Sequence, residues 1–293
     1  GLIFSYRKRK PIYTQLPNIG NNQSPSIKQS NLPVSSKDLV NIDIMDEYQS
    51  IKAIKGAVKG TGALKNHYFY VSNTLALGRT IANPTDSFSI QYQQISPTGK
   101  QCIFTYENSQ FFLNDQGSTN GNILNDIQLS AHQKVSIDKN TLLILGSSNT
   151  DNLSICQLDI RLAKPSSTAL IMQLNTKSHQ FVDLTPTIII WPSMVENLNA
   201  RWIFLVKEVS LSIVNDRIEL GCEDAEPIAY LIYQDGFYLR PAKITDEQNQ
   251  GDKYIIHSHI TINQEIVTRS MPIDEYSKVN LNGCEFSLQA LVE

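Results

Sequence analysis

The sequence predicts an all-β fold, built as two β-sandwich domains in series that follow a disordered linker. Short runs rich in aromatic and β-branched residues recur from residue 51 onward, and turn-forming residues separate them at regular spacing. No long stretch has the periodicity of an amphipathic helix. Many short strands joined by such turns are typical of a β-sandwich or a β-barrel.

Size and charge narrow the class of function. The chain has 293 residues, enough for two domains of ordinary size, and its hydrophobic content of 41% can supply a buried core. The formal net charge is −3 and the pI is near 6.0. Nonspecific nucleic-acid binding needs a broad basic surface, so we expect no nucleic-acid partner.

Residues 1–10 combine apolar and basic side chains. Leu2, Ile3, Phe4 and Tyr6 precede four consecutive cations at residues 7–10. Lys and Arg favour the cytoplasmic flank of a membrane span, and the span itself would need about 20 apolar residues. We therefore expect a membrane-proximal stump with a basic flank, whose anchor lies outside this chain. The protein would then be cytoplasmic and tethered to the inner face of a membrane; the alternative is a basic solvated tail.

Residues 11–49 have the composition of a disordered linker. Four prolines stand among many Asn, Gln and Ser residues, and hydrophobic periodicity is weak. We expect this segment to separate the basic stump from the β-rich part of the chain.

The first β region is predicted over residues 50–162. Its expected strands are residues 67–71, 89–92, 102–106, 110–113, 135–137 and 142–145. Residues 115–125 lie between two of these strands and are rich in hydroxyls, amides and glycines. Such a loop is well suited to holding a polar ligand on a rigid β scaffold.

The second β region is predicted over residues 165–293, after a break near residues 163–167. Its expected strands are residues 169–174, 187–191, 202–206, 209–214, 228–233, 236–239, 254–256, 279–281 and 285–288. Trp191 and Trp202 fall in apolar strands, so we expect both rings to pack in a core.

Three motifs of the first region carry a resemblance. Leu77-Gly78-Arg79, then Ile95-Ser96, then Gly117-Ser118-Thr119-Asn120-Gly121 occur in the order and spacing of a forkhead-associated (FHA) domain. The resemblance covers roughly residues 50–162. It implies an eleven-stranded β-sandwich that binds phosphothreonine peptides through loops at one end.

The resemblance also implies roles for individual residues. Arg79 and Ser96 would contact the phosphate, and Asn120 would orient the peptide backbone. The chemistry agrees, because a phosphate dianion needs a cation and neutral donors, and a guanidinium offers a forked pair of donors. The expected phosphopeptide-binding residues are Arg79, Ser96, Thr98, Lys100, Ser118, Thr119 and Asn120. Gly78 and Gly121 would be structural, permitting close backbone approach or unusual dihedral angles.

The sequence departs from the family after Ser96. The family usually continues with Arg, any residue, and a His that braces the loop, whereas here residues 97–101 are Pro-Thr-Gly-Lys-Gln. Lys100 is then a candidate to replace the missing cation. The alternative is a loop that is no longer shaped for phosphate.

Each motif also has an explanation without a ligand. Arg79 can be a surface residue beside a glycine turn, and Asn120-Gly121 is a strong β-hairpin signal by itself. Asp115 and Ser118 can close a turn through bonds from side chain to backbone. A purely structural role, without ligand binding, is therefore the alternative for these residues.

The second region is similar to a degenerate copy of the first. Residues 217–222 resemble the strand that leads into the Gly-Arg motif, with Cys222 where the Arg should be. If this region is FHA-like, it lacks the serine and the Gly-Ser-Thr-Asn-Gly loop. We then expect a structural part or a phosphate-independent interaction module.

Other candidate sites are weak. The four cysteines contain no Cys-x-x-Cys pair, and Cys102, Cys156 and Cys284 stand in apolar strand contexts that favour small buried side chains over disulfides. His257 and His259 alternate along a strand, which favours a surface strand over a metal site. No nucleophile elbow, zinc-protease motif or phosphate-binding loop occurs. We expect no cofactor, no metal and no enzymatic activity.

The sequence thus predicts a phosphothreonine-dependent protein-interaction module. It would bind a phosphothreonine-containing partner protein and so couple this protein to Ser/Thr kinase signalling. One alternative is a phosphate-independent scaffolding protein of a membrane-associated complex. Another is an accessory segment of an enzyme whose catalytic part precedes Gly1.

Overall fold

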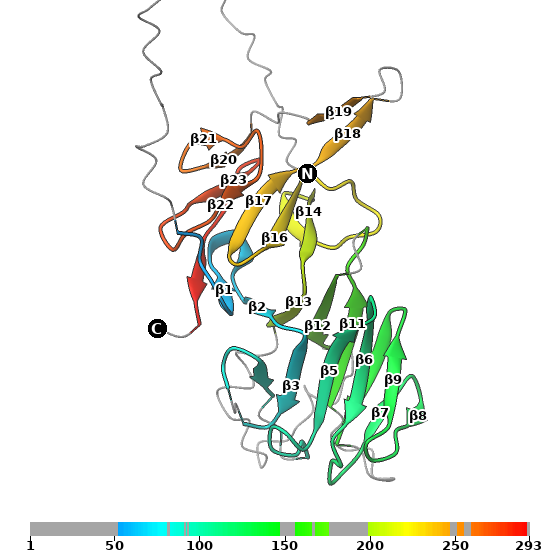
Figure 1. Ribbon diagram of the computed structural model, residues 1–293. Helices are drawn as coiled ribbons and strands as arrows, with labels where there is room; N and C mark the ends of the chain where they lie inside the picture. The colour runs from blue at the N-terminus through cyan, green and yellow to red at the C-terminus, as the bar shows by residue number, and fades with distance from the viewer. Residues whose placement is uncertain are drawn as a thin grey trace, which may run out of the picture. The chain divides into compact units, whose positions relative to one another are not determined.

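The computed structural model describes residues 52–80, 83–90, 92, 94–146, 156–165, 168–175, 199–246, 251–254 and 259–291, all in one compact unit. Within these residues, regular structure consists of strands β1 to β25 and one 3₁₀ turn at Gly62–Leu64 (Figure 1). The predicted all-β fold is confirmed for this part of the chain. Residues 1–49, Trp191 and His257 lie outside the described residues.

The first layer is a five-stranded sheet that belongs to the first β region. Its strands, in spatial order, are β4 (Ser87–Ser89), β3 (Thr74–Gly78), β5 (Cys102–Glu107), β6 (Gln110–Asp115) and β9 (Lys134–Ile137). Along β5 and β6 buried and part-exposed residues alternate, as expected for a sheet with one face against a core.

The second layer is a nine-stranded sheet that draws on both β regions. Its strands, in spatial order, are β25 (Leu288–Ala290), β1 (Val58–Gly60), β2 (His67–Val71), β13 (Arg201–Leu205), β12 (Ala169–Leu174), β11 (Cys156–Leu162), β10 (Thr141–Leu145), β7 (Asn122–Leu124) and β8 (Ile127–Gln128). β2 and β13 are parallel neighbours, whereas the other pairs of this sheet are antiparallel.

The remaining sheets are formed by strands of the second β region alone. A five-stranded sheet contains β15 (Arg217–Leu220), β14 (Glu208–Val214), β16 (Ala229–Tyr233), β17 (Phe237–Pro241) and β22 (Met271–Pro272). A four-stranded sheet contains β21 (Glu265–Ile266), β20 (Ile260–Ile262), β23 (Val279–Leu281) and β24 (Cys284–Phe286), and β18 (Lys243–Asp246) pairs with β19 (Gly251–Tyr254).

Strands β12 and β13 are buried on both faces. Leu170 and Trp202 belong to a first core with the β3–β5–β6 sheet, while Ile171 and Ile203 belong to a second core with β14, β16 and β17. Each strand therefore has four consecutive buried residues, in contrast to the alternation along β11. Continuous apolar runs in the sequence reflect this position between two cores.

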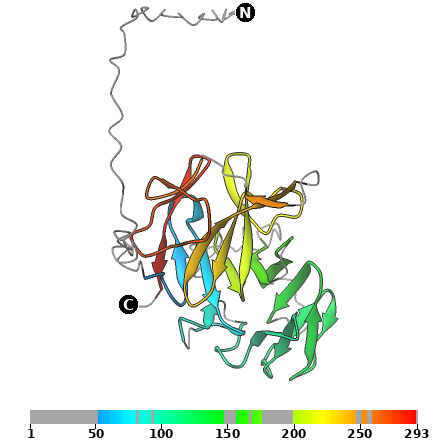
Figure 2. The ribbon, with the colours of Figure 1, turned by 45° about the horizontal axis from the view of Figure 1, so that its top comes forward.

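The N-terminal strands β1 and β2 complete the second core. Figure 2 shows them in blue beside the red C-terminal strand. Val58 and Phe69 pack in the second core, and Tyr70 faces the first. The predicted boundary between residues 162 and 165 falls between β11 and β12, which pair directly. The division into two domains stays a prediction, and the two cores share one sheet.

The two halves repeat one strand order. The order β8–β7–β10–β11 recurs as β21–β20–β23–β24, and β3–β5–β6–β9 recurs as β14–β16–β17–β22. The hairpin turns match in detail, because Asn125 Oδ1 accepts the N–H of Leu142 and Asn263 Oδ1 accepts the N–H of Lys278, each at 2.9 Å. This repetition supports the second FHA-like domain, which stays a prediction. It equates β3 with β14, rather than with the strand that precedes Cys222.

The cysteines divide into buried and accessible pairs, and none forms a disulfide. Cys102 and Cys156 are buried as predicted, and burial raises the pKa of both thiols, that of Cys156 to about 12. The prediction of a buried Cys284 is wrong. That residue lies on β24, an edge strand, and is part-exposed, with its thiol donating to Asp216 O at 3.3 Å.

Candidate functional site

Three loops of the first β region meet around Ser96. They follow β3, β4 and β6, and they carry Arg79, Ser96 and Thr119. The backbone N–H of Arg79 donates to Ser96 O at 2.9 Å, and the N–H of Thr119 donates to Ser96 Oγ at 3.0 Å. Ser96 therefore joins the other two loops, and the structure brings three predicted site residues together.

Ser96 itself is 4% exposed. Its N–H donates to the side-chain oxygen of Gln101 at 2.7 Å. Since its hydroxyl oxygen accepts from Thr119, the hydroxyl hydrogen is the one donor that Ser96 can still offer to a ligand.

Gly78 lies against the loop that follows Ser96. A Cβ at this position would stand 2.3 Å from both the Cα and the backbone nitrogen of Thr98, closer than such contacts allow. Thr98 Oγ1 is buried on the same side and has no hydrogen-bond partner among the described residues. The close approach of two backbones thus requires glycine at position 78.

Two predicted cations are exposed at this end of the sandwich. Arg79 follows Gly78 directly, and Lys100 ends a turn in which its N–H donates to Pro97 O at 3.0 Å. Gly99 has a φ of +85° within that turn. The loop after Ser96, which departs from the family pattern, therefore forms a turn that exposes Lys100.

The Gly-Ser-Thr-Asn-Gly loop is held by a buried carboxylate. Asp115, 2% exposed, accepts the N–H groups of Gly117 and Ser118 at 2.7 and 3.0 Å through Oδ1. Its Oδ2 accepts the Ser118 hydroxyl at 2.7 Å and the Asn122 amide at 2.5 Å. The Ser118 hydroxyl is thus engaged in closing the turn, as the scaffold interpretation expects.

Asn120 reaches across to the loop that carries Ser96. Its side-chain nitrogen donates to both the backbone oxygen and Oε1 of Gln94, at 2.9 and 3.0 Å. Gly121 follows with a φ of +75°, and its carbonyl accepts the N–H of Gly146 at 3.0 Å. Thr119, which precedes Asn120, is exposed.

Sequence reasoning missed two residues of this site, Gln101 and Asn122. Both are 0% exposed, and the side-chain nitrogen of Gln101 donates to Asn122 Oδ1 at 2.6 Å. A buried glutamine has no recognisable pattern in one sequence. The only available signal was its place after the departing loop.

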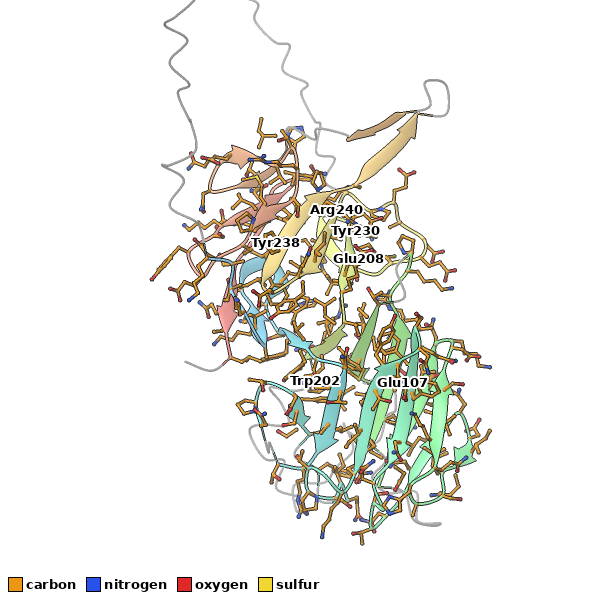
Figure 3. All side chains as sticks on the ribbon, in the orientation of Figure 1. Glu107, Trp202, Glu208, Tyr230, Tyr238 and Arg240 are labelled. Atoms are coloured by element: carbon orange, nitrogen blue, oxygen red, sulfur yellow. The ribbon has the colours of Figure 1, made fainter. Side chains whose placement is uncertain are left out.

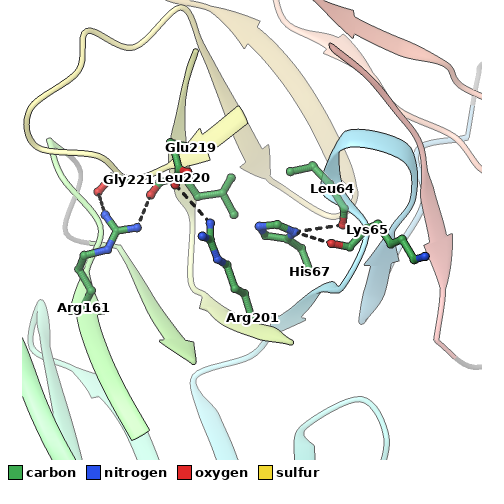
Figure 4. A network of polar contacts seen from close by, with 8 residues as sticks. All are labelled: Leu64, Lys65, His67, Arg161, Arg201, Glu219, Leu220 and Gly221. Atoms are coloured by element: carbon green, nitrogen blue, oxygen red, sulfur yellow. Dashed lines mark hydrogen bonds and ion pairs between the residues drawn. The ribbon is translucent and has the colours of Figure 1, made fainter. Parts of the chain in front are cut away.

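A second polar network joins β11 and β13 of the nine-stranded sheet to β15 (Figure 4). Arg161 donates to the carbonyls of Leu220 and Gly221, and Arg201 pairs with Glu219 at 3.2 Å. Burial lowers the pKa of Arg161. A neighbouring cleft of about 630 Å³ is lined by both arginines, by Glu219 and by Asp159. Because side chains of both charges line the cleft, its lining favours neither an anionic nor a cationic ligand.

His67 belongs to the same region. Its Nδ1 lies 3.1 Å from the carbonyl oxygens of both Leu64 and Lys65, and Nε2 is buried with no partner in the described part of the chain. Burial lowers the pKa of His67, and the charge of Arg201 lowers it further. A neutral ring with a proton on Nδ1 fits these contacts.

The outer face of the β14–β16–β17 sheet carries polar and aromatic side chains (Figure 3). Arg240 pairs with Glu208 at 2.8 Å and lies over the Tyr230 ring at 4.9 Å. Among the described residues, no group of three or more His, Cys, Asp or Glu side chains is placed to hold a metal ion. Nor does that part of the chain contain a helix long and apolar enough to cross a membrane.

Comparison with known proteins places the site in a family. No curated protein sequence matches the chain. The FHA-1 crystal structure from Mycobacterium tuberculosis Rv1747 is 17% identical, with 32% of this chain and 88% of that chain covered and a TM-score of 0.23. The solution structure of the FHA domain of an Arabidopsis thaliana hypothetical protein is 17% identical, with coverages of 34% and 94% and a TM-score of 0.24. The FHA domain family model matches residues 75–146, which include every predicted binding residue, and this part of the chain is therefore an FHA domain.

Proposed function

We propose that this FHA domain binds a phosphothreonine-containing segment of a partner protein, and that the chain acts by binding rather than by catalysis. FHA domains are protein-interaction modules that generally bind phosphothreonine. The observation that carries the proposal is the meeting of three loops at Ser96, where the backbone of Arg79 is hydrogen-bonded to the backbone of Ser96 and that of Thr119 to the Ser96 hydroxyl. A guanidinium and a neutral donor together suit a phosphate dianion.

Within this proposal each residue has its own part. Arg79 supplies the forked cation, and the Ser96 hydroxyl donates its remaining hydrogen to a phosphate oxygen. Lys100 adds positive charge from the turn over Gly78, and the exposed Thr119 meets the peptide. Asn120 and Ser118 hold the loop in place through Gln94 and Asp115.

Phosphothreonine peptides and their unphosphorylated counterparts test the proposal. We expect wild type to bind the phosphorylated form selectively, and Arg79→Ala to bind it roughly 10- to 100-fold more weakly, because hydrogen bonds to charged groups contribute about 1.5–3 kcal/mol. Arg269→Ala, which removes an exposed arginine from the loop before β22, is the matched control and should bind like wild type. Isothermal titration measures all three.

Two results would count against the proposal. If the wild-type protein does not bind the phosphorylated peptide selectively, the proposal of phosphothreonine binding is wrong. Binding unchanged in Arg79→Ala would remove the role of Arg79 alone.

A phosphate-independent scaffold is the second candidate, and a specific observation favours it. The N–H of Ser96, the hydroxyl of Ser118 and the side-chain nitrogen of Asn120 all donate within the protein. Under this function, phosphorylated and unphosphorylated peptides of one sequence bind equally. The same titration therefore decides between the two candidates.

We also infer from residues 1–10 that the protein is held at the inner face of a membrane. The four consecutive cations at residues 7–10 support this, because basic residues flank spans on the cytoplasmic side. Fractionation of cells that express the full-length protein tests it. Recovery in the soluble fraction alone would contradict tethering.

A further inference from the structure

We propose that Gln101 is the positioning residue of the phosphopeptide site, a role that rests on the proposed function of the FHA domain. Its side chain is 0% exposed and contacts both Ser96 in its own loop and Gly121 at the end of the loop that carries Thr119. A fully buried amide at such a place must find partners for both its oxygen and its nitrogen.

The amide has partners at both ends. Its oxygen accepts the N–H of Ser96 at 2.7 Å. Its nitrogen donates to Asn122 Oδ1 at 2.6 Å, with a longer contact of 3.4 Å to Gly121 O. One side chain thereby links the phosphate-facing serine to the end of the recognition loop.

The backbone of Gln101 continues the connection. Its carbonyl accepts the N–H of Gln116 at 3.2 Å and the side-chain nitrogen of Asn122 at 3.1 Å. That same nitrogen of Asn122 lies 2.5 Å from Asp115 Oδ2, which also accepts the Ser118 hydroxyl. A continuous chain of hydrogen bonds runs from Ser96 to Ser118 without using an exposed side chain.

The geometry explains why a glutamine occupies the position. The Ser96 N–H needs an acceptor and Asn122 Oδ1 needs a donor, and a glutamine amide supplies both from one side chain without taking up a proton. Loss of either leaves a buried polar group unpaired, which the loops relieve by moving apart. Loops held in the bound arrangement lose less conformational freedom when a ligand arrives, so Gln101 favours binding without touching the peptide.

Substitution by methionine in the full chain tests this role. Gln101→Met keeps the length and apolar stem of the side chain and removes both hydrogen-bonding ends. Gln133→Met is the matched control, since Gln133 also accepts a backbone N–H, from Ser130 at 2.8 Å, but at an exposed loop. We expect Gln101→Met to bind a phosphothreonine peptide roughly tenfold or more weakly at a temperature where it remains folded, and Gln133→Met to bind like wild type.

Amide hydrogen exchange gives a readout that does not depend on the ligand. In wild type the Ser96 amide should exchange far more slowly than the exposed Gly99 amide, and in Gln101→Met this protection should be lost while the β5 and β6 amides stay protected. Gln101→Glu, which keeps an acceptor for Ser96, should retain more Ser96 protection than Gln101→Met.

The outcomes separate the two proposals. Equal phosphopeptide binding by wild type and Gln101→Met overturns the positioning role alone. A Ser96 amide in wild type that exchanges as fast as that of Gly99 overturns it as well, even if no variant folds. Absence of phosphopeptide binding by wild type overturns the proposed function, and with it any positioning role in binding.

Discussion

Gly78 has no room for a side chain, because the backbone of Thr98 would stand 2.3 Å from its Cβ. Backbone atoms cannot rotate out of the way as a side chain can, so Gly78→Ala must displace the loop after Ser96. We expect this variant to lose about 1–3 kcal/mol in the free energy of unfolding, the range typical of overpacking. We also expect weaker phosphopeptide binding. Urea unfolding and peptide titration measure the two effects.

The control for Gly78 is another glycine with open space around it. Gly283, in the turn between β23 and β24, has a φ of +90° and no neighbour within 4 Å of an added Cβ. Gly283→Ala should lose about 1–2 kcal/mol through backbone strain and keep full binding. A Gly78→Ala protein that binds and unfolds like wild type would contradict the close approach.

Site residues that belong to a sequence motif could be predicted, and site residues outside any motif could not. Gly78, Arg79 and Ser96 stand in strings that resemble a known family, and the structure does bring them together. Gln101 and Asn122 are 21 residues apart in the sequence. Each contributes to the site through its hydrogen bond to the other, which forms only when the fold brings them together. Single-sequence patterns carry no information about such a pair.

Among the strands, those with one buried face were easiest to predict. The expected runs at residues 110–113 and 142–145 correspond to β6 and β10, along which buried and part-exposed residues alternate. The sheet to which a strand belongs could not be predicted. The apolar run of β13 indicates only that both faces of the strand are buried, and it does not say which sheet contains the strand. Only pairing with β2 and β12 places it between the two cores.

The pair of β2 and β13 also predicts a pH effect. His67 on β2 faces Arg201 on β13, and burial, then the arginine charge, lowers the pKa of His67 from its usual 6.5. Below pH 6.5 the unfolded chain binds the proton and the folded chain resists it, so stability present above that pH is lost as the pH falls. We expect urea unfolding to show a larger fall in stability from about pH 7.5 to about pH 5.5 for wild type than for His67→Gln.

The exposed His259 provides the comparison for His67. His259→Gln makes the same chemical change without removing a buried ring, so it should keep the pH dependence of wild type. Equal pH dependence in wild type and His67→Gln would show that the buried histidine does not cause the effect.

At the scale of the whole molecule, the shared sheet couples two cores that the sequence suggested were separate domains. Trp202 lies on β13, outside residues 75–146 that match the FHA domain. Its ring nevertheless stacks on Phe88 in the first core, with ring centroids 4.9 Å apart and ring planes at 27°. The next residue, Ile203, packs in the second core. Neither core can lose β13 and keep its packing.

We therefore expect the described unit to unfold in one cooperative transition, and Trp202→Ala to destabilise both cores together. Removal of a buried tryptophan costs about 3–5 kcal/mol, a large share of the roughly 5–15 kcal/mol that a domain has. Calorimetry should show one transition shifted to lower temperature, and hydrogen exchange should accelerate in both β6 and β16. Tyr276→Ala, at a side chain that is 79% exposed, should leave both unchanged. If Trp202→Ala splits the transition in two, or leaves the amides of β6 protected, then each core folds without the other and the shared sheet does not couple them.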